Sequence, residues 1–266
     1  MDPWSDPASD LDQGEARAFR RIGEAHELYW PILGSITIEP SGEVHVRAHD
    51  RAPHGIIPHA ILGPVCAHWI TLQGKIALHA NCVSVDGELV AVVGPSGSGK
   101  SSLAAALLAQ GALPHCDDIV SLEPETALVP FGTSRIKLNP DILDRLPLNP
   151  LAVGALYDGL DKRSVLFAFP KDVSTRPLKA IYCLRDVEAD EAPSFKAITG
   201  FAVALGLMRE VYRPEIVHEV VGLEPLLRRC ASLVGKVRMF ELHRHKDLKQ
   251  IELLAEAVMD HAKSLG

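Results

Sequence analysis

The alternation of apolar and polar residues predicts a small β-rich part near the start of the chain. Ile32–Ile38 and Glu43–Arg47 have the composition of strands, and the turn-forming residues Pro40–Gly42 lie between them. His59–Leu72 follows with apolar residues at helical spacing and is predicted to be a helix. We therefore expect residues 19–74 to form a small β-rich N-terminal part.

A second apolar block predicts strand, tight turn, strand and helix in succession. Leu78–Val85 and Glu88–Val93 are apolar runs of strand length, and the Asp86-Gly87 pair between them is a strong hairpin signal. Ser102–Ala109 is predicted to be a helix, and Gly111 is a natural residue to end it. The second arm of the hairpin therefore leads through a short loop into a helix.

Weaker patterns continue to the end of the chain. Residues 112–116 and 119–122 have the composition of short extended segments. The remaining predicted elements are strands at Ser164–Phe169, Ala180–Leu184 and Val237–Leu242, and helices at Asn139–Leu146, Ile198–Val211, Glu224–Val234 and Asp247–Lys263. Strands that alternate with helices favour an α/β domain over residues 75–266.

Composition narrows the class of protein. The chain has 266 residues, of which 47% are hydrophobic and 23% charged, so a sizeable core is available. The formal net charge of -7 argues against general binding to nucleic acid or to anionic membranes. No apolar run reaches the length of a membrane span. We expect neither a nucleic-acid partner nor a membrane partner.

The ends of the chain and its thiols point to the cytoplasm. Residues 1–18 are acidic, have little to bury, and are expected to form a mobile tail. Met1–Asp6 lacks the basic and apolar regions of a signal peptide. The five cysteines are scattered without C-x-x-C spacing, as expected of buried thiols in a reducing compartment. His54, His59, Cys66 and His68 lie close in sequence but match no zinc pattern, which favours core residues over a metal site.

The loop after the hairpin carries the most informative motif. Residues 94–101 fit G-x-x-x-x-G-K-[ST], the Walker A phosphate-binding loop, in the strand–loop–helix setting that binds phosphate. Successive backbone N–H groups can turn toward one anion, Lys100 can reach the β- and γ-phosphates, and the Ser101 hydroxyl can ligate Mg²⁺. The candidate nucleotide-binding residues are Gly94, Pro95, Ser96, Gly97, Ser98, Gly99, Lys100, Ser101 and Ser102.

Phosphoryl transfer also requires groups that orient the acceptor, and an acidic pair is the first candidate. Asp117 and Asp118 follow the loop helix closely, at the end of a short strand. Because side chains alternate along an extended backbone, the two carboxylates are expected to point to different places and to divide the work. The alternative is a solvated turn with a helix-capping aspartate.

A histidine and four cations are further candidates. His79 lies in the strand paired with the loop strand, where it could equally be a core residue. Arg135, Lys137, Lys162 and Arg163 could neutralise phosphate charge or bind an acidic acceptor, or could be solvated surface charges. His243–Lys246 is expected to be an exposed boundary before the last helix.

Four features in this order resemble the catalytic domain of HPr kinase/phosphorylase. They are the tripeptide Leu78-His79-Ala80, the Asp86-Gly87 hairpin, the Walker A loop and the Asp117-Asp118 pair, within about residues 75–124. The resemblance implies an α/β fold with a P-loop core related to phosphoenolpyruvate carboxykinase. It also implies an ATP- and Mg²⁺-dependent kinase that phosphorylates a serine hydroxyl.

The resemblance also implies roles for single residues. Asp117 resembles the general base, and Asp118 resembles its acidic companion near the metal, so that Ser101 and Asp118 are the candidate metal ligands. His79 resembles the histidine that contacts this acidic centre. Members of the family are hexameric, which makes a homo-oligomer compatible with the resemblance.

The chain departs from the family in a way that bears on the acceptor. The Glu-Ile-Arg-Gly-Leu-Gly signature is absent, and the corresponding region is Phe131–Asp141. The chain is more similar to the shorter HPr-kinase-like proteins of bacterial peptide-modification systems, among them lasso-peptide kinases that phosphorylate the C-terminal serine of a precursor. The expected partner is a peptide or protein bearing a serine. An HPr-type protein kinase, a kinase of free serine and a non-catalytic nucleotide-binding regulator are the alternatives.

Overall fold

The N-terminal part contains an antiparallel sheet and an interrupted helix. The computed structural model describes residues 18–188 and 192–266, so the acidic tail lies outside the described residues apart from its last position. The sheet has the order β1-β2-β3-β4, formed by Ala18–Ile22, Ala25–Trp30, Gly34–Ile38 and Val44–Ala48. The helical segment consists of α1 (Ile56–Ala60), the π-turn η1 (Ile61–Val65) and α2 (Cys66–Leu72).

The helix predicted at His59–Leu72 is present but is broken near its middle. Gly63 has non-helical dihedral angles (φ -104°, ψ -108°), and Pro64, which cannot donate a backbone hydrogen bond, follows it. Strands β1 and β2 were not predicted. In β2 the buried residues include His26 and Glu27, whose polar groups pair with His68 and Arg20. Polar residues can therefore be buried in β2 because partners from other elements bind them, and the hydrophobic pattern of the sequence does not reveal such a strand.

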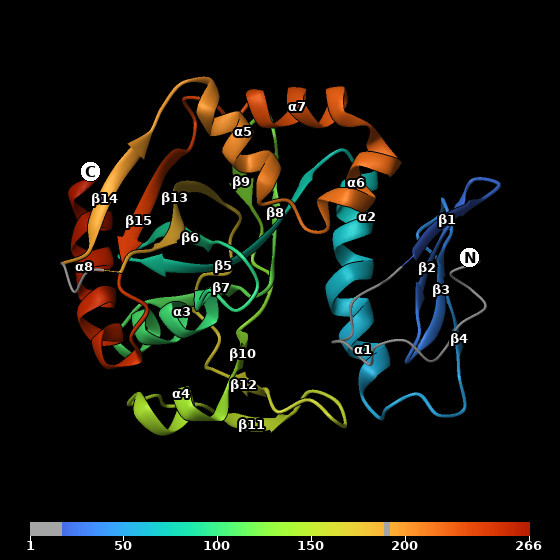
Figure 1. The fold of residues 1–266 in the computed structure, drawn as a ribbon, viewed down its shortest axis with the longest axis horizontal. Coiled ribbons are helices and arrows are strands. Elements are labelled where there is room, and N and C mark those ends of the chain that lie inside the picture. Colours follow the sequence, from blue (N-terminus) through green and yellow to red (C-terminus); the bar gives the residue numbers. More distant parts are fainter. Residues whose placement is uncertain (1–17, 189–191) are drawn as a thin grey trace.

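A mixed sheet of eight strands forms the centre of the remaining chain (Figure 1). Its main path is β14-β15-β13-β6-β5-β7, and two short strands add to β5 and β13. The strands on the path are Ser194–Ile198, Arg238–Arg244, Arg176–Asp186, Glu88–Val93, Ile76–Val85 and Leu113–Cys116, and the additional strands are β8 (Ile119–Leu122) and β9 (Leu128–Val129). The Asp86-Gly87 turn between β5 and β6 has positive φ at both residues, which confirms the predicted hairpin.

Helices cover both faces of this sheet. Helices α3 (Lys100–Ala109) and α8 (Ile251–Ser264) pack on one face, the latter preceded by the short η2 (Leu248–Gln250). The opposite face carries α5 (Phe201–Arg209), α6 (Pro214–Val221) and α7 (Leu223–Ala231). Along β5, alternate residues enter the two cores, so the strand is buried on both sides.

A small three-stranded sheet packs beside α3. Its order is β10-β12-β11, formed by Arg135–Leu138, Arg163–Leu166 and Ala152–Ala155, with helix α4 (Pro140–Arg145) after β10. Strands β9, β10, β11 and β14 and helix α6 were not predicted, because each is only two to eight residues long. The helix predicted at Ile198–Val211 begins only at Phe201, since Ile198 ends β14.

Residues of the following domain complete the core of the N-terminal part. Leu28, Trp30 and Ile56 are buried together with Tyr157 and Ile216, which come from the following domain. Helix α2 contacts β5 and α6, so it lies between the N-terminal sheet and the main sheet (Figure 1). Within the described residues, no helix is both long enough and apolar enough to cross a membrane.

Candidate functional site

The Walker A segment forms a tight loop between β6 and α3. Gly94, Gly97 and Gly99 all have positive φ, at 149°, 74° and 94°. A Cβ added at Gly94 would lie 3.0 Å from Ser98 Oγ and 3.4 Å from Leu184 Cβ, so the close approach there requires glycine. Gly99 is the N-cap of α3, which directs the first N–H groups of the helix into the loop.

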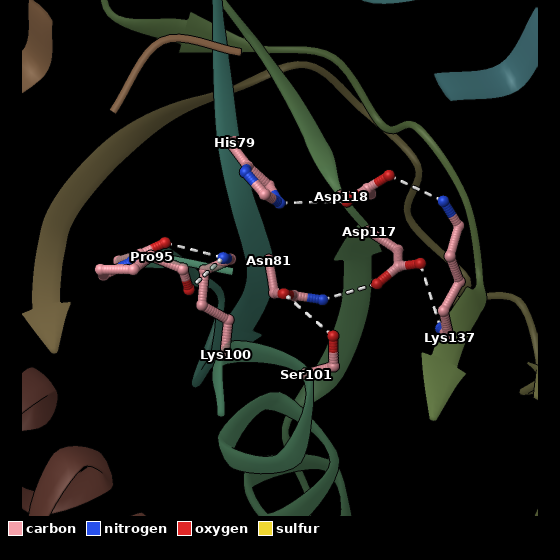
Figure 2. A network of polar contacts seen from close by, with 9 residues as sticks. His79, Asn81, Pro95, Lys100, Ser101, Asp117, Asp118 and Lys137 are labelled. Carbon is pink, nitrogen blue, oxygen red and sulfur yellow. Dashed lines mark hydrogen bonds and ion pairs between the residues drawn. The ribbon is translucent and has the colours of Figure 1, made fainter. Parts of the chain in front are cut away.

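Lys100 lies buried over this loop. Its ammonium donates hydrogen bonds to the carbonyl oxygens of Gly94 at 2.7 Å and Pro95 at 3.2 Å, as Figure 2 shows. Burial lowers the pKa of Lys100, while the negative charges of Asp118 and Glu210 oppose that change. The loop thus holds a buried cation against its own carbonyl oxygens.

An asparagine on β5 connects the loop helix to the acidic pair. Asn81 Nδ2 donates to Asp117 Oδ1 at 2.6 Å, and the Ser101 hydroxyl lies 3.5 Å from Asn81 Oδ1 (Figure 2). Asn81 was not predicted as a site residue. It could have been found from strand periodicity, because it lies two residues after His79 and therefore on the same face of β5.

Both aspartates face the same region, contrary to the expectation from strand alternation. Asp118 has φ of 69°, which breaks the extended backbone between β7 and β8. Lys137 then contacts both carboxylates: its backbone N–H donates to Asp117 Oδ2 at 3.1 Å and its ammonium to Asp118 Oδ2 at 2.7 Å. His79 Nε2 lies 3.3 Å from Asp118 Oδ1. A left-handed residue at such a position stores backbone strain, which is common at functional sites.

The two carboxylates differ in acidity because their surroundings differ. Burial raises the pKa of Asp117, the neighbouring charge of Asp118 adds to this effect, and Lys137 and Asn81 only partly offset it. Burial alone would also raise the pKa of Asp118, but hydrogen bonds and charge from His79 and Lys137 hold it below its usual range. The pair therefore consists of one carboxylate whose ionised form is stabilised and one whose affinity for a proton is raised.

A third acidic residue, which sequence reasoning missed, lies where the loop leaves β6. The Glu210 carbonyl accepts the His79 N–H at 2.8 Å, and its carboxylate accepts the Gly94 N–H. Burial raises the pKa of Glu210, and the positive charges of Arg185 and Lys100 oppose this change. Only the chain reversal after α5 brings this residue to β5, so no local signal could have identified it.

The four candidate cations separate into two groups. Lys137 is part of the acidic centre, and Lys162 lies near enough for its charge to act on Lys100 and His59. Arg135 is exposed and donates to the Ser164 hydroxyl at 3.1 Å, and Arg163 is exposed at the start of β12. The structure therefore brings Lys137 to the carboxylates, places Lys162 near Lys100 and His59, and leaves Arg135 and Arg163 exposed.

His59 faces the site from the N-terminal part. Burial, followed by the charge of Lys137, lowers its pKa to about 4, and its Nδ1 is buried without a partner among the described residues. His68 instead pairs with His26 at 2.7 Å. No group of three or more histidine, cysteine, aspartate or glutamate side chains that could hold a metal ion occurs in residues 18–188 and 192–266.

A cavity of about 700 Å³ opens on the other flank of the loop. Ser98, Gly99 and Ser102 form its loop end, and its apolar wall comes from α3, α4 and α8 and includes Leu103, Ile142 and Leu254. The prediction that His243–Lys246 is an exposed boundary is wrong at Arg244. This side chain is buried, donates to the Ser98 carbonyl and lies 3.1 Å from Asp186, because β15 ends beside the loop.

The oxygen atoms near the loop suit a hard divalent cation whose remaining ligands would come from a nucleotide. Ser101, Asn81 and the two aspartates offer oxygen atoms only, which is the ligand chemistry that Mg²⁺ prefers. Mg²⁺ in nucleotide sites needs only one or two carboxylates, since phosphates and waters complete its coordination. The predicted ligands Ser101 and Asp118 and their neighbours therefore fit such an ion.

Comparisons with known proteins give a distant structural likeness. No family model matches the sequence, and no curated protein matches it. Among solved structures, the chain is similar to the HPr(Ser) kinase/phosphatase from Coxiella burnetii, with 14% sequence identity and a TM-score of 0.36. The match covers 71% of this chain and 97% of that one. A likeness of this degree says nothing about activity.

Proposed function

We propose that this protein is an ATP- and Mg²⁺-dependent kinase that phosphorylates a serine hydroxyl of a peptide. One observation carries the proposal. A phosphate-binding loop with its lysine lies next to a carboxylate pair of unequal acidity, and Asn81 connects Ser101 of the loop helix to Asp117. A protein that only senses a nucleotide would not need a buried carboxylate able to accept a proton.

The two flanks of the loop suggest how a nucleotide lies. The cavity at Ser98 and Ser102 can accommodate a nucleoside, since its volume is in the range of small-molecule sites. The carboxylates lie on the opposite flank, beside Ser101. A nucleotide in this orientation has its α- and β-phosphates on the loop N–H groups and its γ-phosphate directed toward the acidic pair.

The residues present can perform the transfer. Asp117 accepts the serine proton, the serine oxygen forms a bond to the γ-phosphorus, and the bond from that phosphorus to the β–γ bridging oxygen breaks. ADP leaves with the electron pair of that bond, and Lys100 stabilises the negative charge on the transferred and departing groups. Lys137 and His79 keep Asp118 ionised beside this centre. Mg²⁺, when bound, would neutralise phosphate charge.

The proposed acceptor is the C-terminal serine of a lasso-peptide precursor, in keeping with the sequence resemblance. Lys137 and Lys162 support an acidic acceptor, because Lys137 binds Asp118, the charge of Lys162 acts on Lys100 and His59, and both lysines could balance the charge of a terminal carboxylate. Neither lysine identifies the peptide, so the class of acceptor is the part to test.

The test is a transfer assay with radiolabelled ATP, Mg²⁺ and matched acceptors. The acceptors are peptides that end in serine, in serine amide or in alanine, together with free serine. Labelling of only the free-acid serine peptide is the expected result. Equal labelling of the amide would remove recognition of the carboxylate, and labelling of free serine alone would indicate a metabolite kinase. Nucleotide binding without labelling of any acceptor would indicate a regulator.

A further inference from the structure

Strand β11 is an unprotected edge of the small sheet. In the order β10-β12-β11 it pairs only with β12, and no other strand of the described residues lies on its outer edge. All four residues Ala152–Ala155 are exposed, and Leu151 and Val153 are 66% and 50% exposed. The segment from Leu151 to Tyr157 contains no charged residue.

Such an edge is unusual in a folded protein. The backbone N–H and C=O groups of an edge strand can pair with another chain, and natural edges are commonly blocked by charges, proline or a covering element. None of the four β11 residues is charged or proline. A Cβ added at Gly154 would meet no atom within 4 Å, so the face of the sheet is also uncovered at this residue. The strand can therefore accept an additional strand along its backbone.

The far end of β11 leads directly to the candidate active site. Tyr157, two residues after the strand, packs against His59 with ring centroids 5.1 Å apart. Tyr157 also lies near enough to Lys137 to act on its pKa, and Lys137 binds Asp118 at 2.7 Å. A chain that pairs with β11 and continues past Tyr157 would therefore arrive at the carboxylates.

We propose that β11 binds the polypeptide acceptor as an added β-strand and so delivers its serine to the acidic pair. The occupant is an extended peptide segment next to the phosphorylated residue. Main-chain hydrogen bonds supply its affinity, and Leu151 and Val153 contact its alternate side chains. This inference rests on the proposed function for the identity of the acceptor, but the docking itself does not require transfer.

The first experiment leaves the enzyme unchanged and alters the peptide. The probe is a fluorescein-labelled octapeptide with alternating valine and threonine residues and a free C-terminal serine, and its affinity is measured by fluorescence anisotropy. Single backbone N-methyl groups are then placed at successive positions. Because only every second N–H of an added strand faces the edge strand, affinity should fall at least tenfold at alternate positions and stay nearly constant between them. No binding of the parent peptide, or a uniform effect of methylation, would overturn the proposal.

The second experiment changes the edge. Val153→Pro removes a backbone donor and distorts the edge at an exposed position, and it should weaken peptide binding at least tenfold without changing ATP affinity. Val173→Pro is the matched control, since Val173 is 49% exposed and lies outside the small sheet. Equal weakening by both variants would overturn the proposal. So would a dimer of the parent protein that Val153→Pro dissociates, because a second copy would then occupy the edge.

The outcomes also separate docking from catalysis. Affinity that falls at alternate N-methylated positions, in a protein that transfers no phosphate, would support docking at β11. That combination would reject the proposed kinase activity. Phosphorylation of the peptide with an unaltered KM in Val153→Pro would retain the kinase and reject the docking edge.

Discussion

The ion pair between Lys137 and Asp118 should couple the small sheet to the acidic centre. Lys137→Met keeps the length of the side chain but removes the ammonium that lies 2.7 Å from Asp118 Oδ2. His79 would then be the remaining partner of that carboxylate. The variant should therefore lose stability, mainly because a partly buried charge is left without its cation.

The magnitude follows from the exposure of the pair. Removing one partner of a fully buried ion pair costs about 3–5 kcal/mol, whereas surface pairs contribute less than about 1 kcal/mol. The side chains of Lys137 and Asp118 are 22% and 25% exposed, so this pair lies between the two limits. We expect Lys137→Met to lower the free energy of unfolding by about 2 kcal/mol.

A double-mutant cycle in urea tests this value. The proteins are the parent, Lys137→Met, Asp118→Asn and the double variant, with the midpoint and slope of each unfolding curve measured. The coupling energy should be about 2 kcal/mol. The double variant should therefore lose less free energy of unfolding than the sum of the losses of the two single variants. A coupling energy below about 0.5 kcal/mol would show that water already screens the pair, and the ordering of Asp118 would need another cause.

Three further predictions concern the loop, the base and the histidine pair. Lys100→Ala should abolish transfer and weaken ATP binding at least roughly tenfold, because the buried cation over the loop is lost; calorimetric titration that gives an unchanged Kd would contradict the loop assignment. Asp117→Asn should retain ATP affinity but slow transfer roughly a hundredfold, the scale of general-base catalysis, and transfer at the parent rate would place the base elsewhere. Burial, followed by the charge of His26, lowers the pKa of His68 to about 4, so the unfolded chain binds more protons between about pH 4 and pH 6.5. The free energy of unfolding should therefore fall by about 2 kcal/mol from pH 7 to pH 5 through this residue, and His68→Gln should show a correspondingly weaker pH dependence in thermal melts.

Local sequence was sufficient for the phosphate loop and its flanks. The apolar runs of β5 and β6, the Asp86-Gly87 turn and the glycines at 94, 97 and 99 all act within a few residues of one another. Conformational preference at such short range is visible in a single sequence, so the predicted strand, loop and helix agree with the structure within about two residues. The chemical roles of Lys100, Asp117 and Asp118 remain predictions.

The small sheet shows where local patterns fail. Arg135 and Lys137 were expected only as candidate cations and not as parts of a strand, since an alternation of four residues is too short to be diagnostic. Pairing with β12 makes it a strand, and this pairing brings Lys137 to the aspartates. In the main sheet, long-range packing likewise buries Arg244 beside Ser98, although the neighbours of Arg244 in the sequence are polar.

The sequence by itself determined the glycine-rich loop with the Walker A pattern, its hairpin and helix, and the candidate acidic pair, because each depends on residues adjacent in the chain. Only the tertiary structure decided how these parts meet. The left-handed backbone at Asp118 turns both carboxylates to one side, and Asn81, Lys137 and Glu210 reach the centre from separate elements. The acidities of the carboxylates follow from that burial and those contacts. They are properties of positions in space, which the order of residues along the chain does not contain.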